Sequence, residues 1–198
     1  MPTAFSVMEM RLLGVEDGSF SSYKFQRKGK TILCGVLTKG LKIEEIALRL
    51  IDVDGLDATE KLLDIAEHLG LLDMIILGGV TFGGFNVIDP VVVHEALKTP
   101  VVVVTAERPD NEAVLNALKK HFEDWEIRYK VFERLASISP IYEAKLHPKE
   151  NPIFLEVVGI EFEKAFEILR RVTIRGRIPE PVRIANRIAK AVSRALLL

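Results

Sequence analysis

Apolar and polar positions in the first third of the chain follow the pattern of β-strands. Residues 11–16 and 31–38 are apolar runs separated by a polar stretch, which is typical of a hairpin with a long loop. Residues 43–53 begin like a helix, but their second part, IALRLIDV, alternates like a strand with one buried face. We interpret this segment as a strand, so the three segments predict an antiparallel meander.

Beyond residue 57, helical and strand patterns alternate. Apolar positions at helical spacing predict helices over 57–69, 90–98, 110–122 and 161–172, and a last helix that begins near 181. Short apolar runs predict buried strands at 74–77, 101–105 and 153–158. The segment between Trp125 and the last of these strands gives no clear element. The order of elements indicates an α/β protein with a mixed sheet, three antiparallel strands followed by parallel strands, and helices on both faces.

Composition narrows the class of protein. The 198 residues are 48% apolar and 28% charged, which excludes intrinsic disorder and suits one domain over residues 1–198. No apolar run is long enough to span a membrane, and the first residues lack the pattern of a signal peptide. The lone Cys34 excludes a disulfide framework and a cysteine-rich zinc site. We therefore expect a cytoplasmic protein without a membrane partner.

The near-zero net charge of −1 hides a strong asymmetry. Residues 170–198 contain seven Arg, one Lys and one Glu, and the last predicted helix carries basic residues opposite its apolar stripe. A second basic run precedes the second strand. The basic candidates for nucleic-acid contacts are Lys24, Arg27, Lys28, Lys30, Arg175, Arg177, Arg183 and Arg187. Such runs are either solvated faces or a surface for a polyanion, with nucleic acid the obvious one.

Acidic residues gather at two places. Glu16-Asp17 ends the first strand, where a carboxylate could hold Mg²⁺, although Asp17-Gly18 is also an ordinary turn. Because side chains alternate along a strand, at most one of this pair would face a shared site. The segment DVDGLDATE holds Asp54, Asp57 and Glu60 as further metal candidates. Its structural alternative is a turn at Asp54-Gly55 and a capping box formed by Asp57 and Glu60.

A glycine-rich turn, GGVTFGGF, follows the predicted strand at 74–77. Backbone N–H groups of Gly83 and Gly84 could approach a phosphate in such a loop. The pattern is neither a P-loop nor a dinucleotide-binding fingerprint, so a nucleotide cofactor is a weak alternative.

Long segments of the chain resemble the archaeal endonuclease dU family, which is related to endonuclease V. The landmarks are LGVEDGSF (13–20), VDGLDATEKL (53–62), GGVTFGGFNVID (78–89), TAERPDNEAVLNAL (105–118) and RIPEPVRIANRIA (177–189). Asp17-Gly18-Ser19-Phe20 resembles the D-x-S-F of endonuclease V, and the C-terminal third follows the course of its K-P-I-F and R-L-P-E-P segments.

The resemblance implies a ribonuclease H-like fold and Mg²⁺- or Mn²⁺-dependent cleavage of DNA, with RNA as the other candidate, beside a deaminated base (uracil or hypoxanthine). Asp17 matches the first catalytic Asp, and Asp57 or Glu60 could supply the acid at the helix start. Two positions depart from endonuclease V. Gly78 stands where its second core Asp ends strand four, and Ile160 stands where a His follows Gly. Either Asp54, Asp57, Glu60 or Asp89 rebuilds the site, or the protein binds nucleic acid without cutting it. A small-ligand-binding protein is the weaker alternative.

Overall fold

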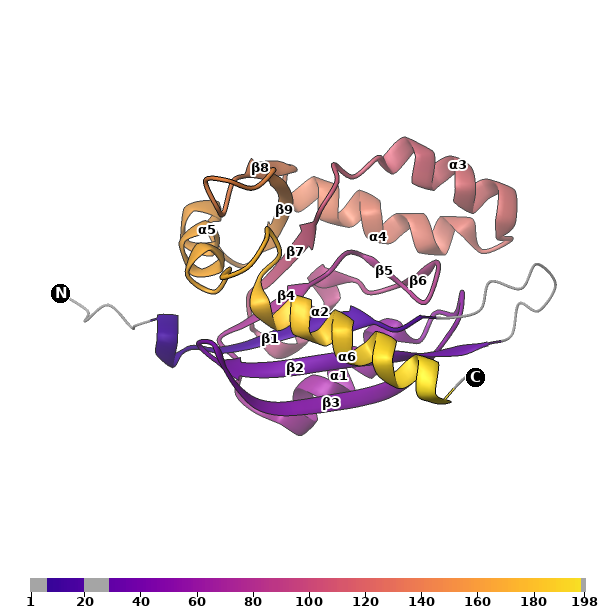
Figure 1. Ribbon diagram of the computed structural model, residues 1–198. Coiled ribbons are helices and arrows are strands. Elements are labelled where there is room, and N and C mark those ends of the chain that lie inside the picture. The colour runs from indigo at the N-terminus through magenta and orange to yellow at the C-terminus, as the bar shows by residue number, and fades with distance from the viewer. Residues whose placement is uncertain (1–6, 20–28, 197–198) are drawn as a thin grey trace.

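The fold centres on one seven-stranded sheet with helices on both faces (Figure 1). The computed structural model describes residues 7–19 and 29–196. The strand order is β3-β2-β1-β4-β7-β9-β8. A short 3₁₀ helix, η1 (Val7–Glu9), precedes β1. No helix in the described ranges is long and apolar enough to cross a membrane.

The first three strands form the predicted meander. They are β1 (Arg11–Asp17), β2 (Lys30–Lys39) and β3 (Lys42–Asp52), and both pairings are antiparallel. The interpretation of residues 43–53 as a strand is confirmed, because Ala47 and Ile51 are buried on one face. Cys34 lies in the core of β2, as its position in an apolar run indicates.

The next strands build the parallel centre of the sheet. Helix α1 (Ala58–Leu69) leads to β4 (Met74–Leu77), and α2 (Pro90–Leu97) leads to β7 (Val101–Thr105). Strand β4 pairs in parallel with both β1 and β7. The ends of β1 and β4 lie side by side, since Gly78 N donates a hydrogen bond to Val15 O at 3.0 Å. The glycine-rich turn folds into a small hairpin of β5 (Thr81–Phe82) and β6 (Asn86–Val87).

After β7 the chain departs from the expected parallel order. Two helices, α3 (Asn111–His121) and α4 (Trp125–Ile138), precede β8 (Tyr142–Ala144) and β9 (Ile153–Val158). Strand β9 pairs antiparallel with β7, so the expectation of a third consecutive parallel strand is wrong. A single crossover helix carries the chain back to the side of the sheet where the preceding strand began, so the next strand is parallel. The two helices α3 and α4 form a hairpin that brings the chain back to the side where β7 ended, so β9 runs antiparallel.

Helix α6 (Glu180–Leu196) follows α5 (Phe162–Arg171) and lies directly on β1. A side chain at Gly14 would collide with the backbone of Pro181 and Val182, so the glycine permits this close approach. Alternation along β1 points Leu13 and Val15 toward the α1 and α2 side, and its even-numbered residues toward α6. The last acidic residues of β1 therefore reach both faces of the sheet.

Candidate active site

Glu16 lies on the α6 side of the sheet, one residue before β1 ends. It lines a cavity of about 230 Å³ whose other lining residues come from the ends of β4 and β7 and from the start of α6: Gly78, Val104, Ala106, Ile178, Val182, Arg183 and Asn186. Burial, and then the charge of Asp17, raise the pKa of Glu16 to about 7, while a hydrogen bond with Asn186 acts in the opposite direction. The pKa of the Glu16 carboxyl group therefore lies well above the usual range of a glutamate.

Asp17 turns to the other face and binds the glycine-rich turn. Its Oδ2 accepts a hydrogen bond from Gly83 N at 2.5 Å. Burial raises its pKa, although this hydrogen bond and the charge of Lys190 lower it. The Gly83 N–H, predicted as a phosphate ligand, is therefore directed at Asp17.

Gly78 leaves room for the Glu16 carboxyl group. A Cβ built at position 78 would overlap Glu16 Oε1 and Cδ and would lie 2.8 Å from its Cγ. The carboxyl group of Glu16 thus occupies the space at the end of β4 where endonuclease V is expected to carry its second core Asp.

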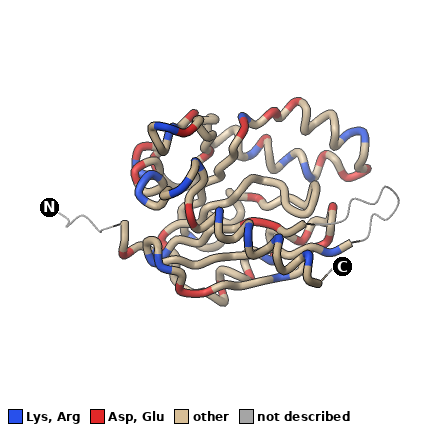
Figure 2. The backbone as a smooth tube through the Cα atoms, viewed as in Figure 1, with Lys and Arg blue, Asp and Glu red and all other residues tan. Residues whose placement is uncertain are grey.

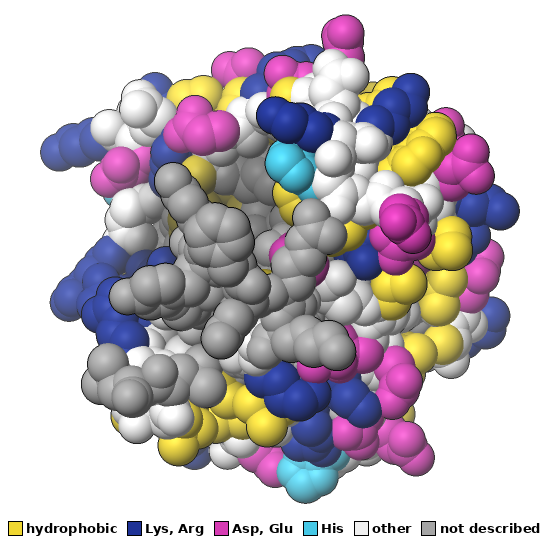
Figure 3. All heavy atoms as spheres, turned by 90° about the vertical axis from the view of Figure 1, so that its right-hand side faces the viewer, with side chains coloured by type: hydrophobic (Ala, Val, Ile, Leu, Met, Phe, Trp, Pro, Cys, Tyr) yellow, Lys and Arg dark blue, Asp and Glu magenta, His cyan; other side chains and the backbone are white. Residues whose placement is uncertain are grey.

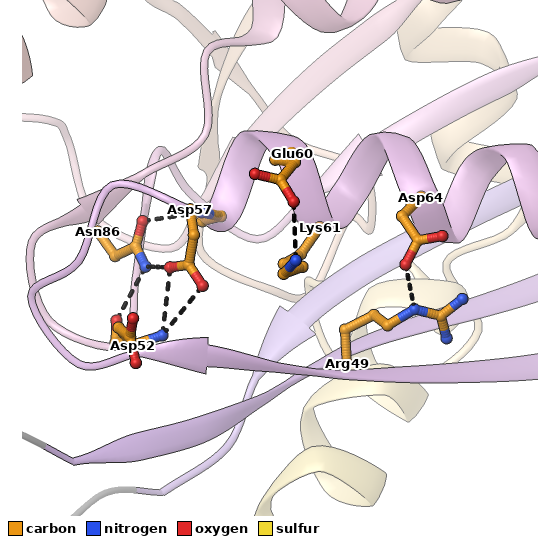
Figure 4. A network of polar contacts seen from close by, with 8 residues as sticks. Arg49, Asp52, Asp57, Glu60, Lys61, Asp64 and Asn86 are labelled. Carbon is orange, nitrogen blue, oxygen red and sulfur yellow. Dashed lines mark hydrogen bonds and ion pairs between the residues drawn. The ribbon is translucent and has the colours of Figure 1, made fainter.

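Asp57 and Glu60 do not form the predicted capping box (Figure 4). Asp57 precedes α1 but makes no side-chain cap; its Oδ1 instead accepts hydrogen bonds from Asn86 Nδ2 at 2.6 Å and Asp52 N at 3.2 Å. The N-terminal cap comes from Asn86, whose Oδ1 accepts from Ala58 N at 3.0 Å. Glu60 is exposed and pairs with Lys61 at 2.8 Å.

Asp54 sits in the predicted turn, with a φ of 57°. Its Oδ1 accepts a hydrogen bond from Phe85 N at 2.9 Å, and its N donates to Gly83 O at 2.8 Å. Asp17 and Asp54 therefore hold Gly83 and Phe85 of the same turn. Asp89, the remaining acidic candidate, caps α2 through Oδ1 and pairs with Arg134 at 2.7 Å through Oδ2.

The acidic candidates do not converge on one point. Within residues 7–19 and 29–196, no three Asp, Glu, His or Cys side chains are grouped so that they could hold a metal ion. That Asp17 shares a site with Asp54, Asp57 or Glu60 stays a prediction; each of these three side chains has another local partner in this structure. Glu16 and Asp17 remain: two oxygen ligands, raised in pKa by burial, with no ion pair to a described residue. The two side chains leave β1 on opposite faces, so only Glu16 lines the cavity, where it offers one carboxylate of the kind that a Mg²⁺ ion takes beside water and phosphate.

Arg128, which the sequence interpretation missed, fixes the turns around the site. Its buried guanidinium donates hydrogen bonds to Asp54 O, Gly55 O and Phe85 O at 2.6–2.9 Å and pairs with Asp124. It thereby ties α4 to the turn before α1 and to the glycine-rich turn. The signal in the sequence was weak, because one Arg in a charged helix gives no sign of burial.

A second cavity of about 230 Å³ opens on the α3 and α4 side of the same strand ends. It is lined by residues 78–81 of the glycine-rich turn and by Thr105, Pro109, Asp110, Asn111, Val114, Phe132 and Glu156. Glu156 is only 6% exposed, and its carboxyl group has no partner among the described residues. Burial raises its pKa to about 7. Thr105 Oγ1 is also buried without a partner. A lone Glu in the apolar run IFLEVV was the available sequence signal for this site.

The basic candidates separate into three groups. Lys24, Arg27 and Lys28 lie outside the described residues, and Lys30 pairs with Asp52 at 2.6 Å. Arg177 binds Ala106 O, Pro152 O and Glu107, and Arg183 pairs with Glu180, so both have structural partners. Arg175 and Arg187 are exposed, as are Lys190 and Arg194. Basic residues follow α6 along its outer side (Figure 2). On the face of the molecule where β1 ends, basic side chains gather on the side of α6 (Figure 3).

Solved structures with the same architecture identify the fold class. A protein of unknown function from Archaeoglobus fulgidus is 32% identical with a TM-score of 0.78, covering 92% of this chain and 98% of that one. Ciona intestinalis endonuclease V, solved with a 24mer DNA containing an inosine, has a TM-score of 0.63 at 15% identity, covering 94% and 87% of the two chains. The predicted ribonuclease H-like fold is confirmed.

The chain belongs to the Endonuclease dU family, whose pattern matches residues 8–193. A UPF0215 protein of Thermococcus gammatolerans is 41% identical over 187 residues, which cover 93% of this chain and 92% of that protein. A UPF0215 protein of Methanothermobacter thermautotrophicus is 36% identical over 189 residues, covering 93% and 88%. The resemblance drawn from the sequence motifs is confirmed at the level of the family.

Proposed function

We propose that this protein is a Mg²⁺- or Mn²⁺-dependent endonuclease that cleaves DNA near a deaminated base, uracil or hypoxanthine. The observation that carries the proposal is the buried carboxyl group of Glu16 in the α6-side cavity. It lies where β1 and β4 end side by side and beneath a basic helix, in a chain of the Endonuclease dU family.

Glu16 would supply a carboxylate ligand to the divalent ion, while Asp17, on the other face, would hold the glycine-rich turn in place. When bound, the ion would activate a water molecule and neutralise charge on the scissile phosphate. Asn186 positions the Glu16 carboxyl group through their hydrogen bond. The Gly83 N–H holds Asp17 at the end of its strand, and the positive charge of Lys190 favours the ionised form of both acids. These contacts orient the carboxylates before substrate arrives.

The exposed basic residues of α6 would contact the phosphate backbone. Arg187, Lys190 and Arg194 lie on the outer side of α6, which also contributes Asn186 to the site. Phosphate contacts of this kind position a nucleic acid without reading its sequence. Helix α6 would thus both orient the carboxyl group of Glu16 and position the DNA backbone that is to be cleaved.

The cavity beside Glu156 and Thr105 would receive the damaged base. An enzyme that acts at a lesion takes the base out of the stack and reads its edge through hydrogen bonds in a pocket. Among the described residues, Thr105 Oγ1 there has no hydrogen-bond partner, Glu156 adds a buried carboxyl group, and the backbone of the glycine-rich turn lines one wall. This cavity and the Glu16 cavity both border Gly78, one on each face of the sheet.

A non-catalytic nucleic-acid-binding protein is the second candidate. It is favoured by the sparse acidic site, because no three ligating side chains are grouped around a common point within the described residues. Ile160, at the position of the endonuclease V His, packs against the core instead. A small-ligand function of the glycine-rich turn is weaker, since Gly83 N–H is directed at Asp17.

A nuclease assay separates these candidates. Duplexes with one uracil, one hypoxanthine or no lesion are incubated with the protein in Mg²⁺, Mn²⁺ or EDTA. We expect metal-dependent cleavage of a lesion duplex that Asp17→Asn and Glu16→Gln abolish, while the exposed control Glu60→Gln leaves it unchanged. Lesion-independent binding with no cleavage in any metal would instead establish the non-catalytic function. A protein that neither binds nor cleaves any of the duplexes would exclude both candidate functions.

A further inference from the structure

Strand β3 has one open edge. It pairs with β2 along its whole length, and it is the last strand in the sheet order, so none of the described strands covers its other side. Eleven residues form this strand, whereas natural proteins usually keep exposed edge strands short. Such an edge offers a row of backbone N–H and C=O groups to another strand.

The face of β3 on the α6 side is unusually apolar for an edge strand. Ile43, Ile46 and Leu50 are 42%, 43% and 49% exposed, and Leu48 packs beside them against α6. The bulge at Glu44 restores Ile43 to the same face as the other three. Helix α6 covers β1 and β2, and strand β3 lies beyond them at the edge of the sheet (Figure 1).

We propose that a second copy of this chain pairs antiparallel with this edge, about a two-fold axis at Ala47. In that register Glu45 lies opposite Arg49 of the second copy, and Ile46 lies opposite its Leu48. The symmetry repeats each pair, giving two opposite-charge pairs and two apolar pairs in five residues. Directly opposed pairs are the unit that stabilises an antiparallel ladder.

The charge pattern favours another copy of the same strand in this register. A two-fold axis at Leu48 would oppose Glu44 and Asp52, which have the same charge. Within one protomer, Glu45 already contacts His68 at 3.0 Å, and Arg49 contacts Asp64 at 2.5 Å. Pairing at Ala47 would place these side chains of both copies in one row of alternating charge on the α1 side. The apolar residues of both copies would pack together on the α6 side.

The test uses the full chain and two charge-reversal variants, Glu45→Arg and Arg49→Glu. We expect the unaltered chain to sediment with about twice its mass of 22.2 kDa at micromolar concentration. In a homodimer of either variant, residues 45 and 49 of the two copies carry the same charge and face each other at two places. We therefore expect the dimer Kd of each variant to rise at least about tenfold. An equimolar mixture restores opposite charges across a heterodimer, so mixing should recover the dimer. Glu133→Arg, on the exposed side of α4, is the control.

The recovery on mixing distinguishes pairing from loss of folding, and circular dichroism melting curves of each variant check the fold independently. A chain that remains monomeric at all concentrations would overturn the proposal. A dimer that both single variants retain, or that the mixture fails to recover, would overturn the Ala47 register.

Discussion

The carboxyl group of Glu16 fills the space that a side chain at Gly78 would occupy. The two residues belong to neighbouring parallel strands, and their ends are held together by the hydrogen bond from Gly78 N to Val15 O. The space between the ends of β1 and β4 can therefore hold a carboxylate from residue 16 or from residue 78, but not from both.

This relationship predicts a reciprocal rescue. Glu16→Ala should abolish metal-dependent cleavage, and adding Gly78→Asp should recover part of it, because the new carboxylate enters the vacated space. Gly78→Asp alone should be poorly folded, since its Cβ would collide with Glu16. Calorimetric titration with Mn²⁺ provides a readout apart from turnover, with binding lost in the single variant and regained in the double variant. If the double variant neither binds Mn²⁺ nor cleaves, Glu16 does not replace the missing acid.

Local patterns were enough to predict most of the fold. The alternation in IALRLIDV identified β3, and Asp89-Pro90 correctly indicated the start of α2, where Asp89 accepts hydrogen bonds from Val91 N and Val92 N. These features depend on neighbours within a few residues. The antiparallel β9 was not predicted, because it follows from the α3–α4 hairpin, whose second helix gave no clear pattern.

The site was harder to predict because its contacts join distant segments. The helix α1 is capped by Asn86, 28 residues away from Ala58, so the local pair Asp57 and Glu60 was a misleading indication. Glu16 was identified as a metal candidate together with Asp17, without a sign of which of the two faces the cavity. Its importance comes from the small size of Gly78, which a single sequence does not connect with it.

Asn86 should stabilise the turn before α1 more than either acidic residue of the expected capping box. Asn86→Ala removes the cap of Ala58 N and the donor to the partly buried Asp57 carboxylate and to Asp52 O, so we expect a loss of about 1–3 kcal/mol in unfolding free energy. Urea denaturation measures this loss. Glu60→Gln, at an exposed site, should change stability by less than about 0.5 kcal/mol. Equal effects of the two substitutions would contradict the assignment of the cap.

Arg128 should act as a buried link between α4 and the turns around the site. Arg128→Met keeps much of the side-chain volume but leaves three backbone carbonyls and Asp124 without their donor, so we expect a loss of about 3–5 kcal/mol. The neighbouring Lys130 is exposed, and Lys130→Met is the matched control with little effect. Chemical denaturation monitored by Trp125 fluorescence measures both variants. A stable Arg128→Met protein would show that the turns hold their shape without this link.

The exposed stripe of α6 should set the salt dependence of DNA binding. Arg187→Ala combined with Arg194→Ala removes two phosphate contacts and should lower the slope of log affinity against log salt by about 1.4–1.8. The loss should be similar for lesion and undamaged duplexes, because phosphate contacts carry no sequence information. Fluorescence anisotropy between low and high salt measures the slope. Lys145→Ala with Lys164→Ala, two exposed lysines outside α6, is the control; an equal decrease there would mean that α6 has no special role.

Glu156 should make the stability of the protein depend on pH. Burial raises its pKa from 4.5 to about 7, so the folded protein binds its proton more tightly than the unfolded chain does. Between these two values the folded state carries more protons, and stability must therefore fall as pH rises from about 4.5 to 7 and level off above that. The penalty at pH 8 is at most about 3–4 kcal/mol, from 1.36 kcal/mol for each pKa unit.

Glu156→Gln removes this titration while keeping the shape of the side chain. We expect the variant to match the original protein near pH 4.5 and to exceed its unfolding free energy at pH 8, in urea denaturation series across that range. The difference between the two proteins is the quantity to follow, because Glu16 also titrates near pH 7 and contributes equally to both. A difference that stays constant with pH would show that the carboxyl group of Glu156 is solvated or paired in solution. It would then offer no free hydrogen-bonding group to a base in the cavity.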